Sequence, residues 1–127
     1  MASCLVVDRL ARFSCSGREE EREYMRFMLS FRIPTEKANA IMKEGRFAQT
    51  VQSIMEEIQP EAAYFTDVDG ARGGYLIVNM DDASELPAKA EPLFHGMGAT
   101  IQVHLVMTPE DLQKATPALE QAAQKYG

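Results

Sequence analysis

Residues 73–107 constrain the fold of this chain most strongly, because they read as a strand, a short helix and a second strand. Residues 74–80 are a short run of β-branched, aromatic and aliphatic side chains opened by two glycines, which is typical of a strand. Residues 100–107 alternate apolar and polar side chains, which indicates a strand with two distinct faces. Between them, Ser84 is the expected helix N-cap, because Pro87 then falls in the first turn, where no backbone donor is needed. A unit of this kind needs a sheet to lie on.

The part of the chain before this unit supplies two more strands and a longer helix. Residues 25–33 alternate apolar and polar side chains, which predicts a strand. Residues 35–59 read as a helix, and Gly45 is expected to interrupt it because glycine costs about 1 kcal/mol in a helix interior. Residues 62–68 form the next strand, and the glycine-rich turn after them predicts a hairpin with the strand that follows.

The chain ends in a further helix. Residues 108–111 combine a hydroxyl cap, a proline and two acids, which is typical of a helix start. Thr116 and Pro117 are expected to restart this helix midway. The order β-α-β-β-α-β-α predicts an α+β, ferredoxin-like βαββαβ fold with an extra C-terminal helix. Its four-stranded antiparallel sheet has the expected order 4-1-3-2, with the helices of the repeat on one face and the other face bare.

Length and charge restrict the class of protein. A chain of 127 residues is one domain, and its net charge of -6 argues against nucleic acid or an anionic membrane as a partner. No apolar run approaches the roughly 20 residues needed to cross a bilayer. Cys4 and Cys15 have neither metal-ligand nor disulfide-framework spacing, which indicates a reduced, cytoplasmic protein.

Residues 1–24 differ from the rest of the chain. A brief apolar patch is followed by a dense run of charges at residues 18–23, without convincing helix or strand periodicity. We expect residues 1–24 to be a disordered N-terminal extension, and the alternative is a short arm packed on the domain. The folded domain is expected to span residues 25–127.

Alternation along the predicted strands decides which side chains line the bare face. They are Met28, Ser30, Arg32, Tyr75, Ile77, Asn79, Gln102, His104 and Val106, and Tyr64 and Thr66 are expected to join them. This set is too apolar to be simply solvated, yet too polar for an ordinary core. Two copies packed sheet to sheet would bury it around a cavity with a few convergent polar groups, as in many small-molecule sites. The sequence therefore predicts a homodimer.

Several segments resemble a known superfamily. Residues 76–107, with Pro-Leu-Phe at 92–94 and a final Ile-Gln-Val-His strand, are similar to the dimeric α+β barrel superfamily, which includes muconolactone isomerase and antibiotic-biosynthesis-type monooxygenases. Residues 60–65 and 107–112 resemble segments of small uncharacterised bacterial proteins. The resemblance implies the fold. It does not fix an activity, because such barrels host isomerases, cofactor-free oxygenases, haem enzymes and proteins with no known chemistry.

His104 is the best candidate for a catalytic group, because it lies mid-strand on the predicted cavity face and histidine can move a proton near neutral pH. Arg32 is expected to hold a substrate carboxylate. The other predicted ligand-binding residues are Ser30, Tyr64, Tyr75, Asn79 and Gln102. The alternative is that His104 and Gln102 are hydrogen-bonded parts of a wet dimer interface, with Arg32 paired to an acid across it.

The remaining polar residues have structural interpretations. His95 is expected to cap a loop or helix end, and Asp67, Asp69, Asp81 and Asp82 flank turns, where aspartate is favoured for backbone reasons. We expect no metal and no cofactor. The leading hypothesis is binding of a small, partly apolar, carboxylated molecule, with isomerase or cofactor-free oxygenase chemistry. The alternative is a non-catalytic sensor or interaction module whose sheet face only dimerises, so the sequence leaves open whether the chain is an enzyme.

Overall fold

The structure is a computed structural model that describes residues 24–127, so the extension expected over residues 1–24 lies outside the described residues apart from Tyr24. Within this region the strands are β2 (Met25–Arg32), β3 (Ala62–Val68), β4 (Ala71–Met80) and β5 (Thr100–Val106). The α-helices of the same region are α1 (Thr35–Lys43), α2 (Phe47–Ile58), α3 (Leu86–Met97) and α4 (Pro109–Tyr126), and a single 3-10 turn, η1 (Ala83–Glu85), precedes α3.

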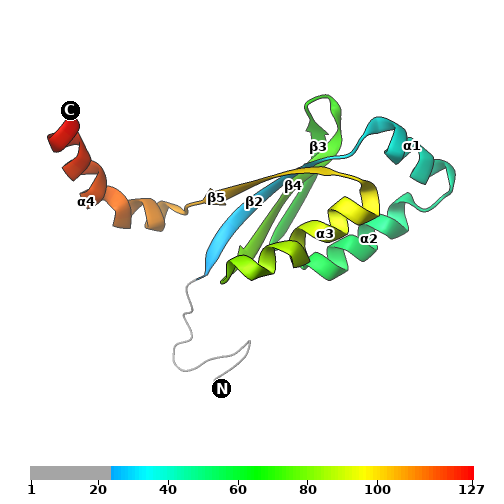
Figure 1. The fold of residues 1–127 in the computed structure, drawn as a ribbon, viewed down its shortest axis with the longest axis horizontal. Helices are drawn as coiled ribbons and strands as arrows, with labels where there is room; N and C mark the ends of the chain where they lie inside the picture. The colour runs from blue at the N-terminus through cyan, green and yellow to red at the C-terminus, as the bar shows by residue number, and fades with distance from the viewer. Residues whose placement is uncertain (1–23) are drawn as a thin grey trace, which may run out of the picture.

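The strands form one antiparallel sheet in the order β3-β4-β2-β5. Numbered along the chain, this is the predicted order 4-1-3-2. Helices α2 and α3 lie side by side over one face of the sheet (Figure 1). The chain therefore has the predicted α+β, ferredoxin-like fold with an additional C-terminal helix.

Turn chemistry sets where the elements begin and end. Gly45 separates α1 from α2 as predicted, with a backbone φ of 73° that glycine adopts without a steric penalty. Asp69 and Gly70 both have positive φ, as a two-residue hairpin turn requires, so β4 begins directly after them at Ala71. The predicted start at residue 74 was three residues too late.

The predicted N-cap of the central helix was wrong. The Ser84 hydroxyl donates a hydrogen bond to Asp82 Oδ2 at 3.0 Å, and Asp82 Oδ1 accepts one from the Ser84 backbone N–H at 3.5 Å. Asp82 is therefore the cap of η1, and α3 continues directly from that turn with Pro87 in its first turn. The Asp82 carboxylate has two acceptor oxygens, one for the Ser84 N–H and one for the Ser84 hydroxyl. The Ser84 hydroxyl is used as a donor in this turn and does not cap the helix itself.

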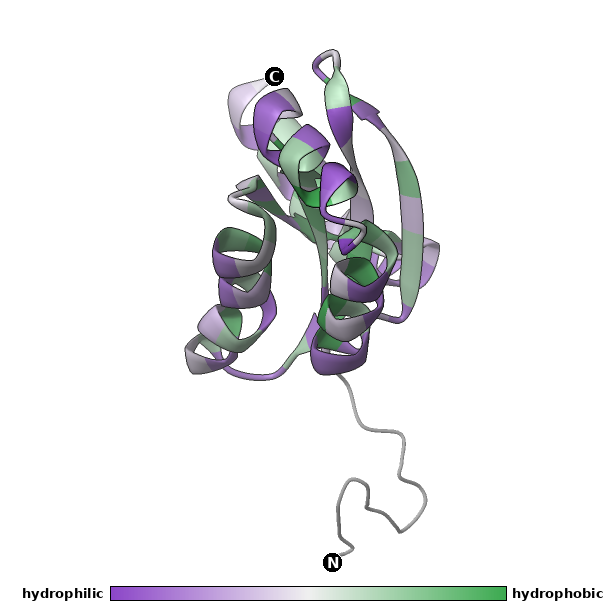
Figure 2. Cartoon of the chain, turned by 90° about the vertical axis from the view of Figure 1, so that its right-hand side faces the viewer, coloured by the Kyte–Doolittle hydropathy of each residue, from purple (hydrophilic) through white to green (hydrophobic). Residues whose placement is uncertain are grey.

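The core lies between the sheet and the two covering helices. Hydrophobic and hydrophilic residues alternate along the helices and strands, as the hydropathy colouring shows (Figure 2). The central strands supply Leu29, Phe31, Leu76 and Val78, α2 and α3 supply Ile54, Ile58, Leu93 and Met97, and α1 adds Ile41, all buried. At the two sheet edges the covering is incomplete: Phe65 on β3 is 56% exposed and Leu105 on β5 is 63% exposed.

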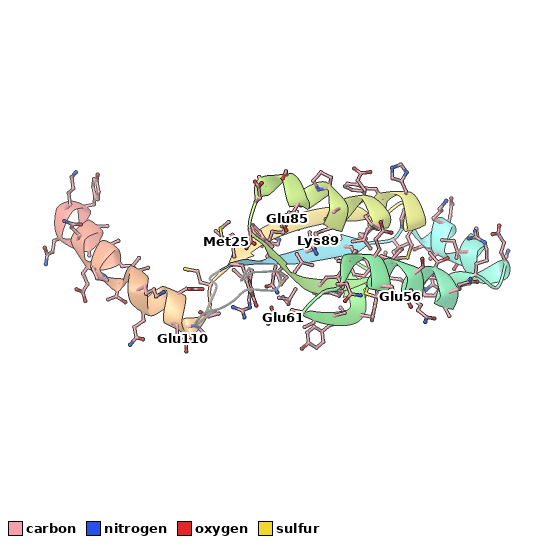
Figure 3. All side chains as sticks on the ribbon, turned by 90° about the horizontal axis from the view of Figure 1, so that it is seen from below. Met25, Glu56, Glu61, Glu85, Lys89 and Glu110 are labelled. Carbon is pink, nitrogen blue, oxygen red and sulfur yellow. The ribbon has the colours of Figure 1, made fainter. Side chains whose placement is uncertain are left out.

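Helix α4 leaves the end of β5 and extends away from the sheet and the other helices (Figures 1 and 3). It runs without a break through Thr116 and Pro117, so the predicted restart was wrong. The Thr116 hydroxyl donates to the Leu112 carbonyl at 3.3 Å, while Pro117 removes only one backbone donor. In the part of the chain that the structure describes, α4 has no buried residue.

None of the helices in residues 24–127 combines the length and the apolar composition that crossing a bilayer requires.

Candidate functional site

The face of the sheet opposite α2 and α3 carries all seven predicted site residues. Residues paired across antiparallel strands share a face, and the face changes with each step along a strand. One row across the sheet consists of Gln102, Ser30, Tyr75 and Tyr64. The neighbouring rows bring Arg32 and His104 to the same side. We call this surface the open face, and its members are Arg26, Met28, Ser30, Arg32, Tyr64, Thr66, Tyr75, Ile77, Asn79, Gln102, His104 and Val106.

The register brings some of these residues together and separates others. His104 pairs with Met28, two residues from Ser30 on β2, while Arg32 lies two residues beyond Ser30 in the other direction. The Cα atoms of His104 and Arg32 are therefore separated by about 13 Å along the strands. Asn79 pairs with Arg26, one row beyond His104. A molecule that touches both Arg32 and His104 must be elongated along the sheet.

Two polar atoms of the open face are buried without a hydrogen-bond partner within residues 24–127. They are Arg32 Nε and Asn79 Oδ1. A buried polar atom without a partner costs roughly 1–3 kcal/mol, more when the group is charged, so each such atom needs a physical explanation. Ser30, between these two residues on the face, is also buried, with 7% of its surface exposed.

The other arginine of this face is already paired. Arg26 Nε lies 2.9 Å from Glu61 Oε1, and this bond together with the negative charge of Glu61 raises the pKa of Arg26 further above its ordinary value. Glu61 precedes β3 at the end of the sheet where β2 begins (Figure 3). Arg32 forms no ion pair with any described residue, so its guanidinium is the group suited to an anionic ligand.

A second candidate site lies on the opposite side of the sheet and was missed by the sequence analysis. It is an apolar groove of about 950 Å³ between α2 and the β3–β4 hairpin. Its walls include Phe31, Phe47, Val51, Phe65 and Met97, and polar side chains such as Thr35 and Gln52 also line it. The pattern assigned the α2 stripe to the core, where Ile54 and Ile58 are buried, while Phe47 and Val51 are partly buried and pack against the core with one side open to the groove. No sequence pattern signals that the covering helices stop short of β3.

The residues given structural interpretations have ordinary partners. His95 Nε2 lies 3.0 Å from Glu91 Oε1 on the exposed side of α3. Asp69 occupies the hairpin turn, and Asp82 caps η1. Among the described residues no group of three or more His, Cys, Asp or Glu side chains could hold a metal ion.

The fold and the open face define a ferredoxin-like α+β protein with an uncovered sheet face of mixed polarity. Residues 25–120 match the family described as Domain of unknown function (DUF3303), and the chain belongs to this family. Comparison with curated proteins found no match, and comparison with solved structures also found none.

Proposed function

We propose that the chain is a homodimer that binds a small, partly apolar carboxylate between two open faces. Met28, Ile77 and Val106 supply apolar surface, while Ser30, Tyr75 and Gln102 supply hydrogen-bonding groups beside it. Packing two such faces would bury this mixture around a ligand, the composition usual for small-molecule sites. The arrangement is that of the dimeric α+β barrel superfamily, which the sequence resembles.

The unpaired Nε of Arg32 carries the proposal. A guanidinium binds a carboxylate with two parallel hydrogen bonds, and its fixed geometry selects a planar anion. Ligand binding would give this buried atom the partner that it lacks within residues 24–127. Because His104 lies about 13 Å farther along the strands, the other end of an elongated ligand would reach the imidazole.

His104 is the group that we assign to proton transfer. A neutral imidazole accepts a proton from the bound molecule and can return it at another atom, which is an isomerisation without a cofactor. Tyr75 and Tyr64 lie in the row beside the histidine and would orient the ligand through their hydroxyls. The same proton removal would also begin a cofactor-free oxygenation.

Ligand-dependent thermal unfolding tests the binding site. Phenylacetate and hexanoate are expected to raise the unfolding temperature of the native chain, and the matching alcohols are expected to raise it less. Arg32→Gln should remove the preference for the acids. Arg46→Gln is the matched control, because Arg46 is exposed and paired with Glu44 Oε1 at 2.6 Å, away from both the open face and the apolar groove. Equal responses of both variants would contradict the role of Arg32.

The histidines separate an enzyme from an interaction module. His104→Ala should leave the dimer and ligand binding intact while abolishing exchange of the ligand's acidic C–H protons with deuterated solvent, followed by NMR. His95→Ala is the control, because that side chain is 84% exposed and its one ion pair within residues 24–127 is with Glu91. Loss of dimer stability in His104→Ala, with no proton exchange in the native chain, would instead favour a sheet face that serves only to dimerise.

The apolar groove is a second location for a ligand, favoured by its volume and aromatic walls. Val51→Trp would fill the groove and leave the open face unchanged. If this variant, and not Arg32→Gln, abolishes the thermal response, the ligand binds in the groove and the open-face proposal is wrong.

A further inference from the structure

Helix α4 has an apolar side that nothing in the described chain covers. Leu112, Ala115, Leu119, Ala122 and Tyr126 recur at three- and four-residue intervals and therefore form one stripe. Leu112 is 48% exposed, Leu119 is 55% exposed and Tyr126 is 80% exposed. Gln121 lies on the opposite, polar side of the helix. An isolated helix of this length is marginal in water, so its stability calls for tertiary packing of the stripe.

A matching apolar patch lies at the edge of the sheet from which α4 departs. It consists of Phe94, Val103 and Leu105, each at least 41% exposed. Val103 and Leu105 point to the side of the sheet that α3 covers, because they pair with Leu29 and Phe27. Phe94 lies on the flank of α3 away from α2, since Gly96 and Lys89 approach Ile54 and Ile58 on the other flank. A third helix laid beside α3 would cover this edge patch.

The connection between β5 and α4 is too short for α4 to reach the edge patch of its own chain easily. Only Met107 and Thr108 separate the strand from the helix. Thr108 is held in a capping box: its N–H donates to Asp111 Oδ2 at 3.0 Å, and its hydroxyl oxygen accepts from the Asp111 N–H at 3.1 Å. Met107 alone remains to reverse the chain. Short hinges of this kind favour exchange of an element between copies over folding back.

We propose that α4 is exchanged between two copies of the chain, with the apolar stripe of each α4 covering the edge patch of its partner. A second copy fits because it carries both surfaces. In a two-fold dimer each stripe covers the patch of the other chain, so neither stripe and neither patch stays exposed. A different protein that covered α4 would leave the edge patch exposed. This exchange goes beyond ligand binding, since it requires neither a ligand nor contact between the open faces.

Single charge insertions test whether α4 contributes to assembly. Leu119→Glu places a carboxylate on the apolar stripe of both exchanged α4 helices, which we call the arms. We expect the dissociation constant of the dimer to rise about 100-fold. Gln121→Glu adds the same charge to the opposite side of α4 and should leave it unchanged. Leu105→Glu should weaken the dimer as Leu119→Glu does. Because both leucines are more than half exposed in a single chain, each variant is expected to fold, which circular dichroism would check.

Mixing the two weakened variants tests the exchange itself. A pair of Leu119→Glu chains has two damaged arms, and a pair of Leu105→Glu chains has two damaged patches. A mixed pair keeps one intact α4 on one intact patch and places both charges in the other contact, where the second charge costs little because the first has already disrupted that contact. Analytical ultracentrifugation with one variant fluorescently labelled should therefore show mixed dimers about 10-fold tighter than either pure dimer.

Each other outcome overturns the proposal. No preference for mixed dimers would mean that α4 packs on its own chain. Full strength of the pure Leu105→Glu dimer would mean that the arms contact each other or another surface, and loss of assembly in Val51→Glu instead would place α4 in the apolar groove. Because none of these variants changes Arg32 or His104, failure here leaves the ligand-binding proposal testable, and the converse also holds.

Discussion

At the scale of single residues, two adjacent glycines in β4 are required for contact between strands. A Cβ on Gly74 would lie 2.1 Å from the Tyr64 carbonyl oxygen, and a Cβ on Gly73 would lie 2.0 Å from the Phe31 carbonyl oxygen. Both contacts involve backbone atoms of paired strands, which cannot move aside as a flexible side chain does. Gly74→Ala should therefore lower the free energy of unfolding by about 3 kcal/mol, measured by urea denaturation.

Gly70→Ala is the control for this prediction. Gly70 lies in the turn of the same hairpin with a φ of 82°, and a Cβ there would meet nothing within 4 Å. Alanine at that position has only the conformational penalty of a left-handed backbone, about 1 kcal/mol. Similar losses in both variants would show that backbone conformation, and not the contact with β3, determines the need for glycine at position 74.

These glycines also show how far residues could be assigned from the sequence. The cluster of glycines correctly predicted the hairpin, but only Gly70 belongs to the turn, while Gly73 and Gly74 lie inside β4. A sequence pattern cannot distinguish a glycine needed for positive φ from one needed for close approach. The open face was predictable because strand alternation is a strict period of two. The lack of a partner for Arg32 Nε depends on side-chain positions that no period encodes.

At the scale of elements, the capping box predicts how the start of α4 responds to acid. Hydrogen bonds from the Thr108 backbone N–H and hydroxyl lower the pKa of Asp111 below its ordinary value of 3.8, and the charges of Lys114 and Arg26 act in the same direction. A carboxyl group with a lowered pKa in the folded state stabilises that state fully above the ordinary value. The contribution is lost as the pH falls from 3.8 through the lower folded value.

The helical signal of α4 should decrease in that acidic range. Circular dichroism would follow it, with Asp111→Asn as the comparison, because the amide oxygen can still accept from Thr108 but does not titrate. The difference between the two profiles should appear only below pH 3.8. Superimposable profiles would mean that the Asp111 charge does not support the helix.

Element starts were more predictable than element placement. The start of α4 follows from Thr108, Pro109 and Asp111, which act within a single turn. Its continuation through Pro117 was not predicted, because loss of one hydrogen bond competes with the cooperativity of the surrounding turns. The direction in which α4 leaves the sheet depends on packing, and the apolar stripe alone is compatible with any hydrophobic surface.

At the scale of the whole molecule, the open face and the exchanged arms are two separate proposed interfaces between copies of the chain. The open face is opposite α2 and α3, whereas the edge patch lies beside α3 at the end of the helical layer. The two surfaces share no residue. If both contacts join the same two chains, their contributions to the free energy of dimerisation should add, because the two interfaces involve different residues.

A double-variant cycle tests this addition. Ile77→Glu places a charge in the middle of the open face, in the row of Met28 and Ala62, and should raise the dimer dissociation constant about 100-fold because the carboxylate would be buried on association. Ala88→Glu, on the exposed side of α3, is its control.

When Ile77→Glu is combined with Leu119→Glu, the dimer dissociation constant should rise about 10,000-fold, leaving a folded monomer at micromolar concentrations. If the α4 helices instead join separate open-face dimers, the native chain would form tetramers, either Leu119→Glu or Ile77→Glu alone would halve their mass, and the two together would leave monomers. Sedimentation velocity of the four chains distinguishes one closed pair held by two surfaces from a larger assembly.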